Sequence, residues 1–238
     1  MGQLYLVRHG QASFGTANYD QLSPLGMEQG RILGTWFAEC GLRFDHVVTG
    51  DLQRHRQTAQ ACLETFAPDN LPSQSVDAGF NEYNHDEIML RHRPEFADPQ
   101  EIKHFLARHE NGKKAFQRVF EDAMGRWMSG RHDEEYGESW PVFRQRCVTA
   151  LTRLVDNGGS QRIVVFTSGG TIATLTQHVL GMTDAQVFQL NWSLVNSAVT
   201  KLMFQSGADG KPARVSLSYL NNFSHLEKSR DGALVTYR

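Results

Sequence analysis

The chain has 238 residues, of which 40% are hydrophobic and 21% charged, and this ordinary globular composition excludes wholesale disorder. The 24 lysines and arginines stand against 26 aspartates and glutamates, so a net charge of −2 gives no support to non-specific nucleic-acid binding. No apolar run approaches the ~20 residues that cross a bilayer, and three widely spaced cysteines (Cys40, Cys62 and Cys147) indicate core side chains in a reducing cytoplasm rather than a disulfide framework or a metal site.

Apolar runs alternate with helical patterns along the first 80 residues, the order expected of βα units on a largely parallel sheet. The predicted elements are strands at residues 4–7, 44–49 and near 76, and helices at residues 24–40 and 50–66. Ser23 followed by Pro24 signals a helix start, because serine caps free backbone N–H groups and proline suits the first helical position. His55 and Arg56 are expected on the solvent-exposed face of the second helix.

Residues from about 84 to 138 interrupt this alternation and are polar, helix-prone and rich in histidine. Five of the ten histidines lie here, namely His85, His92, His104, His109 and His132. We interpret the stretch as a helical insertion that covers one face or end of the sheet. Residues 1–238 are therefore expected to form a single domain with a cap inserted at about 84–138. Core packing is the expectation for Trp127 and Trp140.

The βα alternation returns after residue 138. The predicted elements are helices that start near residues 139, 170 and 183, and strands at residues 163–166, 200–204 and 215–220. Residues 163–166 are apolar throughout, as a central parallel strand should be. Thr183 and Gln186 match a capping box, and a turn rich in Gly, Asp, Lys and Pro separates the last two strands. The predicted fold is a three-layer α/β/α sandwich with a mostly parallel central sheet.

The sharpest chemical signal is Arg8-His9-Gly10, which follows the first predicted strand. In open α/β sheets, ligands bind outside the carboxyl ends of the strands. An arginine beside a histidine there could clamp an anion next to a nucleophilic or basic imidazole. Arg54 lies one turn into the second helix, whose start could face the same anion. Taken alone, the tripeptide is better explained as an ordinary surface turn, because short motifs match by chance, and the second segment also fits a solvated helix face.

Several segments, in the right order, resemble the histidine phosphatase superfamily, the phosphoglycerate-mutase-like proteins with an Arg-His-Gly motif. These segments are Leu6-Val7-Arg8-His9-Gly10, Leu22-Ser23-Pro24-Leu25-Gly26 with Gln29, Leu52-x-Arg54 with Thr58-Ala59, Phe80-Asn81-Glu82, Gly137-Glu138-Ser139 with Arg146, and residues 164–170. The third of them is similar to the family pattern S-x-L-x-R-A-x-x-T-A. A chance match of so many ordered segments is improbable.

The resemblance implies a phosphatase that works through a phosphohistidine. His9 would attack a phosphomonoester in line and hold the phosphoryl group covalently. Arg8 and Arg54 would bind the phosphate oxygens with their planar guanidinium groups. Glu82 would donate a proton to the leaving oxygen and later accept one from water. The resemblance implies neither a metal nor an organic cofactor, and it implies a small phosphorylated substrate as the partner, without nucleic acid or membrane.

The sequence departs from the family pattern at Ser168, where the family usually carries a second histidine. A hydroxyl group can donate one hydrogen bond but supplies no positive charge, and loss of a charge-stabilising donor typically costs ~10²–10³ in rate. Either the site is weakened or specialised with Ser168 in place, or another residue compensates. His85 is one candidate, and an ordinary surface position is an equally good interpretation of it. Gln11 and Gly169 complete the expected substrate contacts.

Two other functions stay open. A degenerate binding protein would keep the anion cradle of Arg8, His9 and Arg54 without turnover, although binding alone requires neither a nucleophile nor an acid. A phosphomutase would have to retain and re-present a bisphosphate, and the longer insertion of cofactor-dependent phosphoglycerate mutases is not recognisable. The sequence does not determine the oligomeric state.

Overall fold

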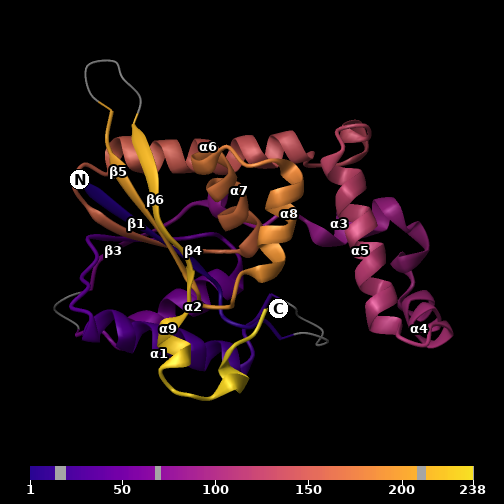
Figure 1. Ribbon diagram of the computed structural model, residues 1–238, viewed down its shortest axis with the longest axis horizontal. Coiled ribbons are helices and arrows are strands. Elements are labelled where there is room, and N and C mark those ends of the chain that lie inside the picture. The colour runs from indigo at the N-terminus through magenta and orange to yellow at the C-terminus, as the bar shows by residue number, and fades with distance from the viewer. Residues whose placement is uncertain (14–19, 68–70, 208–212, 238) are drawn as a thin grey trace. The chain divides into compact units, whose positions relative to one another are not determined.

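The computed structural model describes residues 1–13, 20–67, 71–207 and 213–237 (Figure 1). The chain divides into two compact units. The first comprises Met1–Glu82 and Arg146–Arg238, and the second comprises Tyr83–Gln145. Within the described ranges, every helix is too short or too polar to cross a membrane.

The first unit is built on a mixed sheet that has six strands among the described residues, in the order β3-β2-β4-β1-β5-β6. The strands are β1 (Gly2–Arg8), β2 (His46–Thr49), β3 (Ser73–Val76), β4 (Arg162–Thr167), β5 (Val199–Gln205) and β6 (Arg214–Asn222). The first four of these pair in parallel, whereas β5 and β6 run antiparallel at one edge. The predicted α/β class with a mostly parallel sheet is confirmed.

Helices cover both faces of this sheet, as Figure 1 shows for α1 and α2 on one face and α7 on the other. The helices of the first unit are α1 (Pro24–Glu39), α2 (Gln53–Leu63), α7 (Gly169–Leu180), α8 (Asp184–Ser193) and α9 (Ser224–Glu227), with short 3₁₀ turns η2 (Ala78–Phe80) and η5 (Gly232–Leu234), and α6 (Trp140–Asn157) enters it from the second unit. Side chains alternate along a strand, so Tyr5 and Val7 of β1 share the face that packs against Phe37 of α1.

The local start signals read from the sequence agree with the structure. Ser23 is the N-cap of α1, and its Oγ accepts a hydrogen bond from the backbone N–H of Gly26 at 3.0 Å. The capping box of Thr183 and Gln186 opens α8 as predicted. The turn predicted between β5 and β6 falls on residues 208–212, which lie outside the described part of the chain.

The cysteine prediction is confirmed at two positions and wrong at the third. Cys62 and Cys147 are buried, with 1% and 0% of their surface exposed. Cys40 is exposed, because α1 ends at Glu39 and Cys40 is its C-cap at the surface. All three are free thiols.

Glycine on α1 allows close packing against α2 and the turn that follows it. A Cβ at Gly34 would lie 2.1 Å from the carbonyl oxygen of Cys62 and 2.4 Å from Oγ1 of Thr65. Gly34→Ala should therefore lower the free energy of unfolding by about 1–3 kcal/mol, as overpacking does in other cores. Gly125→Ala is the matched control, because a Cβ there meets nothing within 4 Å. Urea unfolding checks both, and equal stability of the two variants would contradict this packing.

The second unit is helical throughout its described regular structure. Its elements are α3 (His85–His92), η3 (Pro94–Ala97), α4 (Pro99–Arg108), α5 (Gly112–Met128) and η4 (Asp133–Glu135). Trp127 and Trp140 are 1% and 3% exposed and pack edge to face, which confirms the expected core role. The Nε1–H of Trp127 donates to the carbonyl oxygen of Glu138 at 2.9 Å. The organisation of residues 1–238 as a single domain with a cap stays a prediction.

Candidate active site

The carboxyl ends of three neighbouring parallel strands bring the candidate residues to one edge of the sheet. In the β1–β4 pair Arg8 lies opposite Thr167. The next residues, His9 and Ser168, therefore leave the sheet side by side. β2 pairs with the other side of β4 and leads into α2, which carries Arg54. Residues far apart in the sequence meet here because strand pairing, rather than sequence distance, sets their spacing.

His9 is held in one orientation at this edge. It is 5% exposed, and its Nδ1 lies 2.7 Å from the carbonyl oxygen of Gly10. A carbonyl only accepts, so Nδ1 carries the proton and Nε2 keeps its lone pair. The carbonyl oxygen of His9 itself accepts from Nδ2 of Asn196 at 3.1 Å. The imidazole is therefore set up to act as a nucleophile through Nε2.

The surroundings of His9 keep its ring neutral. Burial lowers its pKa well below the usual range, and the positive charges of Arg54 and Arg8, followed by His55, lower it further. The hydrogen bond to Gly10 acts in the opposite direction and is weaker. A neutral imidazole at pH 7 is the form that a nucleophile requires.

Two arginines flank the site, each in contact with oxygen atoms. The guanidinium group of Arg8 donates to the backbone carbonyl oxygens of Leu194 and, at 3.0 Å, Tyr237. Arg54 is 5% exposed, and its Nη1 lies 2.7 Å from Oδ1 of Asp20. The other carboxylate oxygen of Asp20 accepts a backbone N–H at the start of α2 at 2.8 Å. An anionic group therefore already lies between a helix start and a buried arginine.

At the start of α7, Glu82 contacts the turn that follows β4, at residues 168–170. Oε2 of Glu82 accepts the backbone N–H of Gly170 at 3.0 Å, so this carboxyl group caps the helix. Ser168 occupies the N-cap position, but its side chain makes no capping hydrogen bond. A Cβ at Gly169 would lie 3.4 Å from Nε of Arg8, which shows how closely this turn approaches the arginine.

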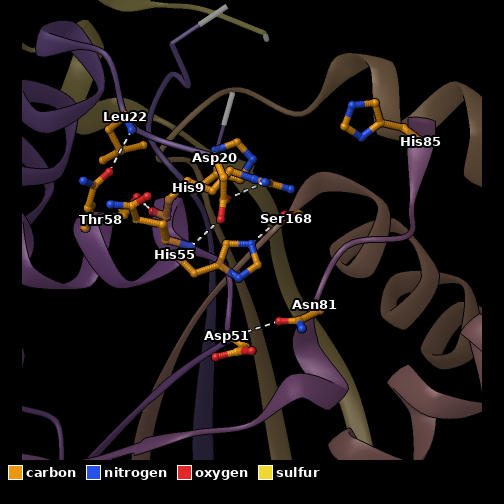
Figure 2. Close-up of polar contacts among 12 residues, drawn as sticks. His9, Asp20, Leu22, Asp51, His55, Thr58, Asn81, His85 and Ser168 are labelled. Atoms are coloured by element: carbon orange, nitrogen blue, oxygen red, sulfur yellow. Dashed lines mark hydrogen bonds and ion pairs between the residues drawn. The ribbon is translucent and has the colours of Figure 1, made fainter. Parts of the chain in front are cut away.

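His55 is a member of the cluster that we did not expect. It has no exposed surface, and its Nε2 lies 2.6 Å from Oγ of Ser168. Figure 2 draws this contact as a dashed line between the His55 ring and Ser168. The centroids of the His55 and His9 rings are 5.8 Å apart, with 36° between their planes. Burial and then the charge of Arg54 lower the pKa of His55 well below its usual range.

The prediction of a solvent-exposed His55 is therefore wrong, although its neighbour Arg56 is exposed as predicted. The physical reason is that His55, Ala59 and Cys62 repeat at i, i+4 and i+7 and form the buried face of α2. The helix also begins at Gln53 rather than near residue 50, which places His55 in its first turn. The i, i+4, i+7 spacing is visible in the sequence and would have identified His55 as buried.

The other two predicted contacts lie in different surroundings. Gln11 follows the Arg-His-Gly segment, and its Oε1 accepts a hydrogen bond from Oγ of Ser23 at 2.8 Å. His85 is the first residue of α3 in the second unit, where its Nε2 lies 3.3 Å from the Asp86 carboxylate. A role for His85 as the compensating residue stays a prediction. Among the described residues, no group of three or more His, Cys, Asp or Glu side chains is arranged to share a metal ion.

Buried neutral histidines make the first unit sensitive to acid. His9, His55 and His225 all have lowered pKa values, and burial lowers that of His225 to about 4. Below pH ~6.5 the unfolded chain binds more protons at these side chains than the folded chain does. Their contribution to stability is therefore complete above pH ~6.5 and is lost as the pH falls towards 4.

The contribution of His225 to this pH dependence of stability can be measured separately. The shift from 6.5 to about 4 corresponds to roughly 3 kcal/mol of stability lost on acidification. His225→Gln should therefore lose less stability than the wild-type protein between pH 7 and pH 4.5 in urea unfolding. An identical pH dependence of the two proteins would contradict a neutral buried His225.

Comparison with known protein families gives a match that extends over most of the chain. The model of the histidine phosphatase superfamily (branch 1) matches residues 4–115 and 108–210. A broad-specificity phosphatase of Saccharomyces cerevisiae is 34% identical over 86 residues, which cover 34% of this chain and 37% of that protein. A 2,3-bisphosphoglycerate-dependent phosphoglycerate mutase of Sinorhizobium fredii is 31% identical over 93 residues, which cover 37% of this chain and 44% of that protein. The chain thus spans less than half the length of these relatives in either match.

Solved structures show the same fold. A phosphoglycerate mutase of Bacillus anthracis superposes with a TM-score of 0.64 and 17% identity, covering 97% of both chains. A phosphoserine phosphatase mutant of Entamoeba histolytica, in complex with phosphoserine, superposes with a TM-score of 0.62 and 17% identity, covering 95% of this chain and 100% of that one. Because the family model extends over most of the sequence, this chain belongs to the histidine phosphatase superfamily.

Proposed function

We propose that this protein is a phosphatase that hydrolyses a small phosphomonoester through a phosphohistidine intermediate on His9. The observation that carries the proposal is the neutral His9 ring. Its Nδ1 is held by the Gly10 carbonyl, and the positive charges of Arg54 and Arg8 act on it. A broad-specificity phosphatase among the relatives supports the same activity.

The first half of the reaction transfers the phosphoryl group to the protein. Nε2 of His9 attacks phosphorus in line, the N–P bond forms, and the bond to the leaving oxygen breaks. Arg8 and Arg54 bind the non-bridging oxygens, for which Arg54 exchanges its Asp20 contact for phosphate. Glu82 gives its proton to the leaving oxygen.

The second half returns the protein to its starting state. Glu82, now a carboxylate, takes a proton from water, and the water oxygen attacks phosphorus. The N–P bond breaks, inorganic phosphate leaves, and the lone pair returns to Nε2 of His9. The backbone N–H groups at the start of α7, near Gly169, add hydrogen bonds to the phosphate oxygens. Ser168 supplies one further donor.

The proposed setting is the cytoplasm, supported by three cysteines that are all free thiols. The proposed substrate is a small phosphorylated molecule. Two solved neighbours were determined with such molecules, one with phosphoserine and the other with 3-phosphoglyceric acid.

Hydrolysis of p-nitrophenyl phosphate, phosphoserine and 3-phosphoglycerate tests the function directly. We expect release of inorganic phosphate that vanadate inhibits and that EDTA leaves unchanged, because no metal takes part in the proposed chemistry. Tight phosphate binding without turnover would favour the binding-protein function instead. Exchange of phosphoryl groups within a bisphosphate, with little phosphate release, would favour a mutase.

A further inference from the structure

A second imidazole lies beside His9, and the proposed mechanism does not use it. His55 is fully buried in the first turn of α2, with Nε2 at 2.6 Å from Oγ of Ser168 (Figure 2). Its ring centroid is 5.8 Å from that of His9. With no exposed surface, His55 can influence a bound phosphate only through another residue, and Ser168 is the residue that it contacts.

The backbone is shaped to admit this ring. A Cβ at Gly50 would lie 2.2 Å from Nδ1 of His55, so any larger residue at position 50 would displace the imidazole. Gly50 and His55 stand where the pattern S-x-L-x-R-A has serine and alanine, and Ser168 stands where the late turn usually has histidine. These three departures are physically linked, because the small residues at 50 and 168 leave the space that the ring at 55 fills.

The proton of the His55 ring can be assigned from its partners. Nδ1 is buried and has no hydrogen-bond partner among the described residues, whereas Nε2 faces the oxygen of Ser168. A buried donor without an acceptor is rarer than a buried acceptor without a donor. The proton therefore sits on Nε2 and is donated to Ser168. Burial, which lowers the pKa of His55, keeps the ring neutral.

Ser168 is left with a proton to donate. A serine at an N-cap usually accepts a backbone N–H of its helix, but Ser168 makes no such bond. Glu82 takes that place by accepting the N–H of Gly170 at 3.0 Å. With its oxygen accepting from His55, the Ser168 hydroxyl keeps its own hydrogen to donate to a different acceptor.

We propose that His55 is a positioning residue, which orients the Ser168 hydroxyl so that it donates to a phosphoryl oxygen bound at His9. The pair His55–Ser168 thus takes the place of a histidine at position 168. The inference rests on the proposed phosphatase function. No bond to His55 forms or breaks during turnover, and its ring keeps one proton throughout.

Substitutions at position 55 give a graded test with p-nitrophenyl phosphate. His55→Phe keeps a ring but removes the donor, and should lower kcat by about 10–100-fold with a smaller change in KM. His55→Gln should recover part of that loss, since its amide N–H can replace Nε2–H. His46→Phe is the control, because His46 also contacts serine hydroxyls, at 2.6 and 2.8 Å, but at the opposite end of β2.

Moving the histidine from position 55 to position 168 tests whether the His55–Ser168 pair takes the place of a histidine at 168. In the His55→Ala background, adding Ser168→His should raise kcat at least tenfold, whereas Ser168→His alone should lower it because two rings compete for one space. Unchanged kcat in His55→Phe, or no gain in the double variant when both fold, would overturn the proposal while leaving the phosphatase function intact. Absence of turnover in the wild-type protein would instead overturn the proposed function.

Nitrogen NMR of histidine-labelled protein, wild-type and Ser168→Ala, tests the geometry without any activity measurement. We expect His55 as the neutral Nε2–H tautomer at pH 7, with its Nε2 resonance shifted in Ser168→Ala. An Nδ1–H tautomer, or a resonance that ignores Ser168→Ala, would overturn the inference whatever the activity measurements show.

Discussion

His9→Ala is expected to abolish phosphate release, with a fall in kcat on the order of 10⁴-fold or more, as loss of a covalent nucleophile does in other enzymes. The variant has no side chain to carry the phosphoryl group, and neither Arg8 nor Arg54 can replace it. The fold should persist, because the alanine keeps the backbone hydrogen bond from His9 N–H to the Thr167 carbonyl. Initial rates with p-nitrophenyl phosphate, together with circular dichroism, measure both effects.

The control for this variant is His46→Ala, which removes a histidine at the far end of β2 and should keep full activity. Turnover above about one percent in His9→Ala would show that phosphoryl transfer takes another route, such as direct attack by water.

Arg54→Ala should have the second-largest effect, lowering kcat/KM by about 10²–10³-fold. Arg54 is buried, and the substitution would remove its charge from the proposed phosphate site. Arg54→Lys should recover only part of the loss, since an ammonium group lacks the planar fork of a guanidinium. Arg56→Ala offers a matched control two residues away, because Arg56 is exposed and pairs with Asp51.

The same substitution should also change the pH profile. Arg54 is the largest charged contributor to the lowered pKa of His9. Without it the pKa of His9 should rise, so the acidic limb of kcat/KM should move to higher pH in Arg54→Ala. An acidic limb that stays in place in Arg54→Ala would show that the limb does not report on His9.

Much of the fold could be predicted because its signals are local. Residues 163–166 form an uninterrupted apolar run that becomes β4, and Ser23 before Pro24 places the start of α1. The strand order could not be predicted in the same way. β4 lies between β1 and β2, although it comes more than a hundred residues later, and only tertiary packing selects those neighbours.

For the candidate site, too, some residues could be predicted from local sequence signals, and others could not. Arg8, His9 and Arg54 follow strands or open a helix, so the rule for open α/β sheets places them together. The sequence suggests His85 as the residue that compensates for the missing histidine, because His85 is close in sequence to Glu82, and that role stays a prediction. The contact of His55 with Ser168, 113 residues apart in the chain, was not expected from the sequence. A contact of that kind depends on the β2–β4 pairing, and no short-range pattern reports it.

The central claim, a phosphohistidine on His9, is tested most directly by intact-mass spectrometry. The protein would be mixed with p-nitrophenyl phosphate or acetyl phosphate near pH 6 and quenched rapidly in base, with His9→Ala treated in parallel. We predict an acid-labile adduct of one phosphoryl group on the wild-type chain, none on His9→Ala, and release of inorganic phosphate. An adduct that persists in His9→Ala, or turnover without any adduct on the wild-type chain, would contradict the claim.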